Sequence, residues 1–388
     1  MGQPALQGGG GTVQPLPQRE GRLETVDMHI NIGPQHPATH GVFRMVLQVD
    51  GERIVGCTPH IGYLHRGFEK LSENEEWHDV IIHLDRTDYL AQFNNELCYL
   101  MGLEKLLGVE IPERAQYARV ILAELNRIAS HMMFYGAFGA DAGAMTPFLY
   151  GFRERERLQR LFEAVSGARL MHFYFRAGGL KEDLPEGFVQ EVRRLIPVIL
   201  AGIDECDTLL TRNEVFLSRT VGVGAITAAE AIDYGCSGPV LRACGVKEDV
   251  RRSDPYSLYP TLDFDIPVGS NGDSFDRYLV RMEEMRESVR IITQCLDRIP
   301  DGPIRTPVPR YPHIRVEPGE IYVHTENPRG DYGLYIVSKG GTDPYRVKLR
   351  SPCFCNLMAL EAMLRDAYLA DAVVILGSID IVLGEVDR

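Results

Sequence analysis

The sequence predicts an α+β fold, with a central bundle of long helices and small antiparallel sheets formed by the N- and C-terminal parts of the chain. Apolar and polar residues alternate near both ends of the chain, a pattern typical of half-buried strands. Between these ends lie long stretches with apolar residues at helical spacing. Proline and glycine stand where such helices would begin and end.

The N-terminal part is predicted to form a small sheet. Residues 26–32 (VDMHINI) and 42–49 (VFRMVLQV) alternate apolar with polar side chains, as strands with one buried face do. A third strand is expected at RIVGCTP, residues 53–59.

The connection NIGPQHPATHG, residues 31–41, places His36 and His40 four residues apart. That spacing puts two side chains on one face of a helix, but Pro34 and Pro37 exclude a helix here. The segment is therefore predicted to be a long hairpin connection that presents both histidines at the end of the sheet.

The middle of the chain is predicted to be helical. A helix over residues 112–136 starts with Pro112 in its first turn, and a second over 146–167 starts with Thr146 as N-cap and Pro147 at the first helical position. The first helix carries an apolar stripe made of Ile121, Leu125, Ile128, Met132 and Tyr135. Further helices fit residues 76–107, 186–215 and 274–299, and together these helices indicate a bundle.

The C-terminal part returns to mixed structure. Residues 319–341 are predicted to be a hairpin with an NPRG turn, and YRVKLR (345–350) another strand. NLMALEAMLRDAY (356–368) is expected to be a helix and AVVIL (372–376) a short strand. The predicted organisation is thus a tail (1–24) and one domain (25–388), divided into an N-terminal β part (25–75), a helical core (76–300) and a C-terminal mixed part (301–388).

The amino-acid composition limits the classes of function that the chain can have. The net charge of −13 argues against a nucleic-acid partner, which would need clustered Lys and Arg. The first twenty residues are rich in Gly, Pro and Gln and lack a signal peptide pattern, so a disordered cytoplasmic tail is expected. Eight cysteines occur without a C-x-x-C pair, so buried reduced thiols are expected rather than a metal site.

One apolar stretch raises the question of a membrane span. From Met132 to Phe152 the only charged residue is Asp141. This length approaches the roughly 20 residues of a spanning helix. The internal acid, four glycines and Pro147 favour a bend within a buried core instead.

Two neighbouring segments gather groups that could carry chemistry. HIGYLHRGFEK (60–70) and HLDRTDYLAQF (83–93) together contain His60, His65, Arg66, Glu69, Arg86, Asp88 and Tyr89. A solvated charged surface is one interpretation, and a functional site is the other. The interleaved glycine and aromatic residues are untypical of a plain solvated helix face.

Asp141 and His131 each have a functional and a structural interpretation. Burial raises the pKa of an aspartate unless a cation compensates, and a neighbouring histidine would be such a cation. Asp141 could equally cap a helix, and His131, beside the apolar stripe, fits a satisfied core histidine. No catalytic triad or phosphate loop is recognisable, and VGVGAITAAE (221–230) lacks the G-x-G-x-x-G spacing. The residues alone therefore indicate a site but no defined reaction.

Several long motifs in a fixed order carry a resemblance that covers the chain from about residue 25 onward. These are NIGPQHPATHG, PHIGYLHRGFEK, DRTDYL, LNRIASH, GAMTPF, FRERE and the closing GEVDR. Together they resemble the D subunit of complex I (NADH–quinone oxidoreductase), which is related to the large subunit of nickel–iron hydrogenases. The resemblance implies a hydrogenase-large-subunit-like fold.

The resemblance implies a quinone site between this chain and a neighbouring subunit, close to that subunit's iron–sulfur cluster. His40 and Tyr89 would hydrogen-bond the quinone head-group, and Asp141 would pair with His40. Further residues would line the quinone cavity: His36, Thr39, Met145 and Phe148. Others would lie near the neighbouring cluster: Arg66, Arg86 and His131. The chain itself would bind no metal or flavin.

The resemblance also implies partners and a location. The partners would be the B subunit, which carries the iron–sulfur cluster, together with the C subunit and the membrane-embedded H subunit. The location would be the cytoplasmic face of a bacterial membrane. Quinone reduction would be coupled to proton translocation by the whole complex.

Three alternatives stand beside this interpretation. A nickel–iron centre needs two C-x-x-C-type pairs, but those positions hold Asp88 with Ala91 and Val382 with Glu385. A non-catalytic connector is disfavoured by the presence of both His40 and Tyr89. A related complex with an electron donor other than NADH remains open, because NADH would bind on another subunit.

Overall fold

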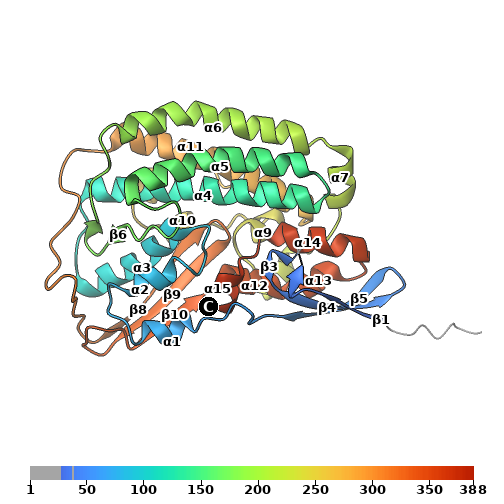
Figure 1. The fold of residues 1–388 in the computed structure, drawn as a ribbon, viewed down its shortest axis with the longest axis horizontal. Coiled ribbons are helices and arrows are strands. Elements are labelled where there is room, and N and C mark those ends of the chain that lie inside the picture. The colour runs from blue at the N-terminus through green and yellow to red at the C-terminus, as the bar shows by residue number, and fades with distance from the viewer. Residues whose placement is uncertain (1–27, 37–38) are drawn as a thin grey trace, which may run out of the picture.

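A computed structural model describes residues 28–36 and 39–388. Long helices form one layer, and two small antiparallel sheets with short helices lie beneath it (Figure 1). This arrangement confirms the predicted α+β class. The predicted tail at residues 1–24 lies outside the described residues, as do Pro37 and Ala38.

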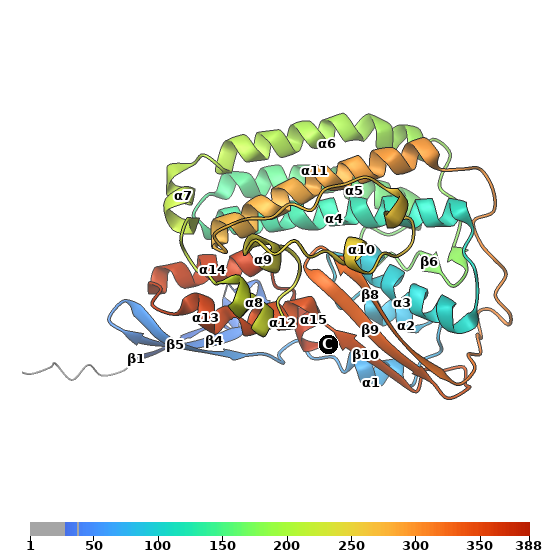
Figure 2. The same ribbon diagram turned by 180° about the vertical axis from the view of Figure 1, so that it is seen from behind.

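The helical layer contains four long helices that run side by side (Figures 1 and 2). They are α4 (Glu113–Asp141), α5 (Met145–Ser166), α6 (Phe188–Leu210) and α11 (Ser274–Arg298). Helix α4 lies at the centre and packs against both α5 and α11. Its predicted apolar stripe is fully buried, which accounts for the position of α4 inside the layer.

The apolar stretch from Met132 to Phe152 is a helical hairpin. Helix α4 ends at Asp141, residues 142–144 turn the chain, and α5 begins at Met145 after Ala144, so the predicted N-cap at Thr146 is wrong. In residues 28–36 and 39–388 no helix has both the length and the apolar character needed to cross a membrane.

Glycine lets α4 and α5 approach closely. A Cβ on Gly151 would lie 2.6 Å from the carbonyl oxygen of Met132, and one on Gly136 would lie 3.2 Å from the Cα of Phe148. Close packing between α4 and α5 thus explains why glycine is present at positions 136 and 151.

Gly151→Ala tests this packing. Alanine favours a helix interior by about 1 kcal/mol over glycine, but here its methyl group meets a backbone oxygen that cannot move aside. We expect a net loss of about 1–3 kcal/mol in the free energy of unfolding. Thermal denaturation would measure it, with Leu149→Ala on the exposed face of α5 as the control. A stability equal to or above that of the native protein would contradict the packing argument.

The N-terminal sheet has the predicted strands. Strands β1 (Met28–Ile32), β4 (Arg44–Asp50) and β5 (Arg53–His60) pair antiparallel in the order β1-β4-β5. Met45, Leu47 and Val49 are buried, as the alternation predicts. The connecting loop adds a two-residue ladder between β2 (Gln35–His36) and β3 (Gly41–Val42).

The C-terminal sheet also has the predicted hairpin. Strands β8 (Gly319–Asn327) and β9 (Gly330–Ser338) are joined at Pro328 and Arg329, and β10 (Arg346–Arg350) completes the order β10-β9-β8. Helix α3 (Gln92–Leu107) packs against β8 and β9.

Several predicted elements were wrong. The helix expected at 76–107 is broken by a turn at 85–91 between α2 (Val80–Leu84) and α3. The expected strand AVVIL belongs to helix α14 (Ala372–Ile379), because a fully buried apolar run does not distinguish helix from strand. The helix expected at 356–368 is two short helices, α12 (Pro352–Met358) and α13 (Leu360–Leu364).

Short elements complete the fold. They are α1 (Phe68–Ser72), β6 (Phe175–Arg176), β7 (Gly179–Leu180), α7 (Glu214–Thr220), α8 (Ala228–Asp233), α9 (Gly238–Ala243), α10 (Val250–Ser253), the 3₁₀ helices η2 (Tyr259–Thr261) and η3 (Leu369–Asp371), and α15 (Leu383–Asp387). Helix α15 lies between the two sheets (Figures 1 and 2).

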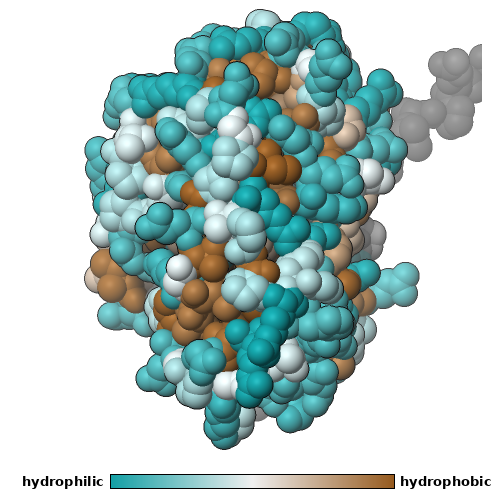
Figure 3. All heavy atoms as spheres, turned by 90° about the vertical axis from the view of Figure 1, so that its left-hand side faces the viewer, coloured by the Kyte–Doolittle hydropathy of each residue, from teal (hydrophilic) through white to brown (hydrophobic). Residues whose placement is uncertain are grey.

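Cysteines and surface are unexceptional. All eight cysteines are free thiols, and six of them are buried. On the side of the molecule shown in Figure 3, hydrophilic residues cover most of the surface and apolar residues gather in separate areas. Such scattered apolar exposure is ordinary for a folded protein and does not by itself indicate a site.

Candidate functional site

His40 and Asp141 form a direct pair between the N-terminal loop and the end of α4. His40 Nε2 lies 2.6 Å from Asp141 Oδ2, and the two side chains are 13% and 12% exposed. His40 adopts a left-handed backbone conformation with φ 51°. The fully buried Thr39 holds this turn, since its hydroxyl lies 2.7 Å from the carbonyl oxygens of both His36 and Gly41.

The surroundings of His40 favour its protonated form. Burial lowers the pKa of His40, but the hydrogen bond and charge of Asp141, together with the charge of Asp380, outweigh burial and the opposing charge of Arg329. The pKa of His40 is therefore raised, which favours the imidazolium, the form that can donate a proton.

Tyr89 stands on the turn that breaks the predicted helix. Neighbouring side chains hold this turn: Asp88 Oδ1 accepts from the amide of Leu90 at 3.1 Å, and Asn95 Nδ2 donates to the carbonyl oxygen of Asp88 at 3.0 Å. Among the described residues the Tyr89 hydroxyl has no hydrogen-bond partner. Burial raises the pKa of Tyr89, so the phenol remains a protonated donor.

Helix α15 connects the His40 loop to the Tyr89 turn. A Cβ on Gly41 would lie 3.0 Å from Leu383 Cδ1, and a Cβ on Gly384 would lie 2.6 Å from the carbonyl oxygen of Thr87 and 3.3 Å from Tyr89 Cδ1. The consecutive residues Leu383 and Gly384 thus contact one side each. The structure brings the predicted residues His40, Asp141 and Tyr89 into one region.

The other residues that were predicted to line the quinone cavity differ in their exposure and in the groups that they offer to a ligand. The hydroxyl of Thr39 is engaged by the loop backbone and fully buried, so the structure gives Thr39 a loop-shaping role. His36 is exposed on β2, opposite Gly41. Met145 is 64% exposed at the start of α5, four residues after Asp141. Half-buried Phe148 packs on Phe152 with ring centroids 4.3 Å apart.

Arg66 and Arg86 lie next to each other at the end of α2. Arg66 Nη2 is 3.4 Å from the carbonyl oxygen of His83, and Arg86 Nη1 donates to that of Ile82 at 2.6 Å. Burial and the nearby charge of Arg86 lower the pKa of Arg66. Two cations are thus held side by side near Tyr89.

His131 does not join these arginines. Its side chain is fully buried, His131 Nε2 lies 2.8 Å from Glu284 Oε2, and burial lowers its pKa. Within the described part of the chain, no contact links His131 to Arg66 or Arg86. Full burial also excludes direct contact with a partner protein. These contacts fit the interpretation of His131 as a satisfied core histidine, and its expected place near a partner's cluster stays a prediction.

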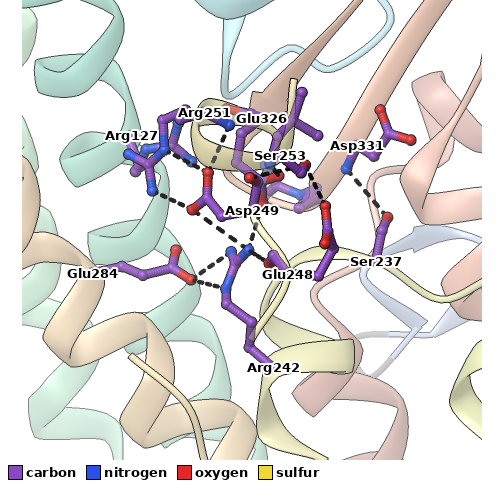
Figure 4. Close-up of polar contacts among 12 residues, drawn as sticks. Arg127, Ser237, Arg242, Glu248, Asp249, Arg251, Ser253, Glu284, Glu326 and Asp331 are labelled. Atoms are coloured by element: carbon purple, nitrogen blue, oxygen red, sulfur yellow. Dashed lines mark hydrogen bonds and ion pairs between the residues drawn. The ribbon is translucent and has the colours of Figure 1, made fainter. Parts of the chain in front are cut away.

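Glu284 belongs to a buried network of charges (Figure 4). Its contact with His131 joins that histidine to the network. Glu284 Oε1 accepts from Arg242 at 3.0 and 2.6 Å, and Arg242 Nη1 donates to Glu326 Oε1 at 2.8 Å. Arg251 extends the network by binding Asp249 at 2.7 Å. These residues come from α9, α10, α11 and β8, so the network fastens the helical layer to the C-terminal sheet. Their wide separation along the chain hides this network from sequence motifs.

His172 belongs to no recognisable sequence motif. The amide of the next residue, Phe173, donates to Asp85 Oδ2 at 2.9 Å, which places His172 beside the turn that carries Arg86. Its ring stacks on Phe93 with centroids 4.2 Å apart, and burial lowers its pKa to about 4. His172 Nε2 has no partner among the described residues. In the sequence, only the aromatic residues next to His172 could have drawn attention to it.

The positions that the sequence resemblance would equate with metal-binding thiolates contain an internal ion pair here. Asp88 binds Arg329 at 3.0 Å, and Glu385 Oε1 accepts from Ser351 Oγ at 2.6 Å and from the amide of Cys353 at 3.0 Å. Burial raises the pKa of Glu385 to about 7. In the part of the chain that the structure describes, no three His, Cys, Asp or Glu side chains are grouped so that they could hold a metal ion.

A separate cleft of about 680 Å³ lies between the end of α3, the start of α4 and residues 255–257. Its lining includes Met101, Gln116 and Tyr256 but none of the predicted site residues. The chemistry of the His40 and Tyr89 region therefore does not extend into this cleft.

Comparisons with known proteins identify the family to which the chain belongs. The family model described as "Respiratory-chain NADH dehydrogenase, 49 Kd subunit" matches residues 141–313 and 310–388. The D subunit of NADH-quinone oxidoreductase from Geotalea uraniireducens is 49% identical over 384 residues, covering 93% of this chain and 98% of the relative. The corresponding D subunit from Desulforamulus reducens is 50% identical over 365 residues, covering 94% and 99%. The chain therefore belongs to the family of the 49 kDa subunit of respiratory-chain NADH dehydrogenase, which is the D-subunit family of NADH-quinone oxidoreductase (complex I).

Proposed function

We propose that this chain binds the quinone head-group between His40 and Tyr89, at a site completed by the neighbouring B subunit. The observation that carries this proposal is that an imidazole paired with a carboxylate and a phenol without a hydrogen-bond partner among the described residues lie on either side of α15. The two groups are hydrogen-bond donors, and they arrive from segments far apart in the sequence.

Quinone chemistry suits these donors. Two-electron reduction places negative charge on the two carbonyl oxygens, and two protons must follow. His40 and Tyr89 stabilise that charge by hydrogen bonds, and His40 can release its proton because it is held as an imidazolium. Asp141 orients the imidazole ring of His40 and stabilises its positive charge. The apolar side chain of Met145 provides a surface for the carbon part of the quinone.

The electron-transfer side of the site is proposed to face the partner's iron–sulfur cluster. Arg66 and Arg86 place positive charge there, which favours a reduced cluster electrostatically. We propose that the buried His172 also lies on this side of the molecule, because the amide of Phe173 donates to Asp85, next to Arg86. We further propose contacts with the B, C and H subunits, on the cytoplasmic side of the membrane, and proton translocation by the whole complex.

Two other functions fit less well. A purely structural connector gives no reason why the buried Tyr89 hydroxyl lacks a hydrogen-bond partner in the part of the chain that the structure describes, or why the pKa of His40 is raised. A related complex with a different electron donor would use the same quinone site, and the measurement of NADH-dependent activity decides between the two.

Tyr89→Phe tests the proposal. Loss of the hydroxyl removes one hydrogen bond to a developing negative charge, which typically slows a reaction roughly 100-fold. In membranes that carry the variant, we expect NADH:quinone activity to fall by that order while NADH:ferricyanide activity is retained. Tyr322→Phe, on the exposed face of β8, is the matched control. Unchanged quinone reduction in Tyr89→Phe would overturn the placement of the head-group.

A further inference from the structure

Arg329 occupies a central position beneath the candidate site. It lies in the turn between β8 and β9, and its side chain is fully buried. Arg329 Nη1 donates to Asp88 at 3.2 and 3.0 Å and to Ser130 Oγ at 2.9 Å. Nη2 donates to Asp380 Oδ1 at 3.1 Å, and Nε donates to the carbonyl oxygen of Asp380 at 2.9 Å.

The two carboxylate partners of Arg329 belong to the two halves of the site. Asp88 immediately precedes Tyr89 and holds its turn through the amide of Leu90. Asp380 ends α14 in a left-handed conformation with φ 60°. Helix α14 also approaches Asp141 closely, since a Cβ on Gly377 would lie 2.5 Å from Asp141 Oδ2. One guanidinium thus binds both the Tyr89 turn and the helix end beside the His40–Asp141 pair.

We propose that Arg329 is a positioning residue that sets the distance between Tyr89 and His40, and that its partner Asp380, at the end of the helix that approaches Asp141, favours the charged form of His40. This inference rests on the proposed quinone site. A planar guanidinium with five donors can bind two carboxylates at fixed geometry, whereas a lysine ammonium on its flexible stem cannot. The buried position excludes Arg329 from direct contact with the quinone.

Charge supports the second half of the inference. The groups that face His40 are Asp141 at the end of α4, Asp380 at the end of α14 and Arg329 from the β8–β9 turn. The two carboxylates raise the pKa of His40, and Arg329 opposes them. Removing the charge of Asp380 alone should therefore lower the pKa of His40 while Arg329 keeps an oxygen partner at that position.

Two variants in the intact complex test the inference. In Arg329→Lys we expect quinone reduction to fall about 10- to 100-fold, as small misplacements of catalytic groups do, with NADH:ferricyanide activity retained. In Asp380→Asn we expect the alkaline limb of the pH profile of quinone reduction to move to lower pH. A merely structural role would change the amount of assembled complex without moving this limb. The exposed Arg212→Lys is the control.

The outcomes separate this inference from the proposed function. If Tyr89→Phe is impaired but Arg329→Lys reduces quinone normally, the quinone site stands and the positioning role is overturned. If Arg329→Lys does not assemble, Asp380→Asn decides: a shifted alkaline limb supports the inference and an unshifted limb overturns it. If Tyr89→Phe is unimpaired, the quinone site itself is wrong.

Discussion

His40→Asn should lower quinone reduction by the assembled complex by about 100-fold or more, because it removes the charged proton donor from the proposed site. Asparagine tolerates the left-handed backbone that His40 adopts, but its shorter side chain ends near the position of the imidazole Nδ1 and loses the Nε2 contact with Asp141. It cannot carry a transferable proton. The measurement is NADH:quinone activity in membranes, with NADH:ferricyanide activity reporting the upstream electron path. Retention of full quinone reduction would exclude His40 as a donor.

Asp141→Asn tests the pH dependence of quinone reduction that we expect from the His40–Asp141 pair. The pKa of His40 is raised above its ordinary value by Asp141 and Asp380 against burial, so activity that needs the imidazolium is complete at low pH and is lost as pH rises through the folded pKa. Without the charge of Asp141, burial dominates and that pKa falls. We expect the alkaline limb to move to lower pH, whereas exposed Asp233→Asn should leave it in place. A limb that stays in place would show that His40 does not control the rate.

Glu284→Gln should destabilise the protein by about 3–5 kcal/mol, the usual cost of leaving one partner of a buried ion pair uncompensated. Glu284 accepts from Arg242 and lies against His131, and all three side chains are buried. Denaturant or thermal unfolding measures the loss. Its neighbour Glu283, which is 55% exposed and pairs with Arg286, is the matched control. Glu283→Gln should cost less than about 1 kcal/mol. Equal effects of the two substitutions would contradict a special role for the buried network.

The same network makes stability depend on pH in two opposing ways. Glu124 joins the network through Arg251, at 3.1 Å. Although burial opposes ionisation, arginines and hydrogen bonds lower the pKa of Glu284, and that of Glu124 to about 2. The stabilisation from both carboxylates is therefore lost as pH falls below their ordinary pKa of 4.5. Burial instead raises the pKa of Glu326 to about 7, so the stability from its neutral form is lost as pH rises toward 7. Maximum stability is expected on the acidic side of neutrality, and Glu284→Gln should flatten the acid limb.

Local patterns predicted most of the fold. The alternation at 42–49 and the NPRG turn led to the observed strands, because period and turn chemistry are local properties. The turn at 85–91 was not predicted, because side chains from elsewhere in the chain hold it against the helical pattern around it. AVVIL failed for another reason: burial on all sides removes the periodicity that distinguishes a helix from a strand.

The candidate site was predictable as a set of residues but not as an arrangement. The family resemblance pointed to His40, Tyr89 and Asp141, and the hydrogen bond between His40 and Asp141 is present. It did not reveal the contact of His131 with Glu284, 153 residues away along the chain, and the place of His131 near a partner's cluster stays a prediction. Arg329 and Asp380 were not predicted at all, because no local sequence pattern indicates their burial or the contacts of Arg329 with both Asp88 and Asp380.

The contact of Leu383 with the Gly41 loop and of Gly384 with the Tyr89 turn has a consequence for biosynthesis. During translation, the His40 loop and the Tyr89 turn are synthesised hundreds of residues before helix α15, which joins them. Until α15 emerges, neither segment has its final support, and pairing across such sequence distances is slow to form. The proposed quinone site is therefore among the last parts of the molecule to mature. A chain stalled during translation before residue 383 would carry both donors without the spacing between them.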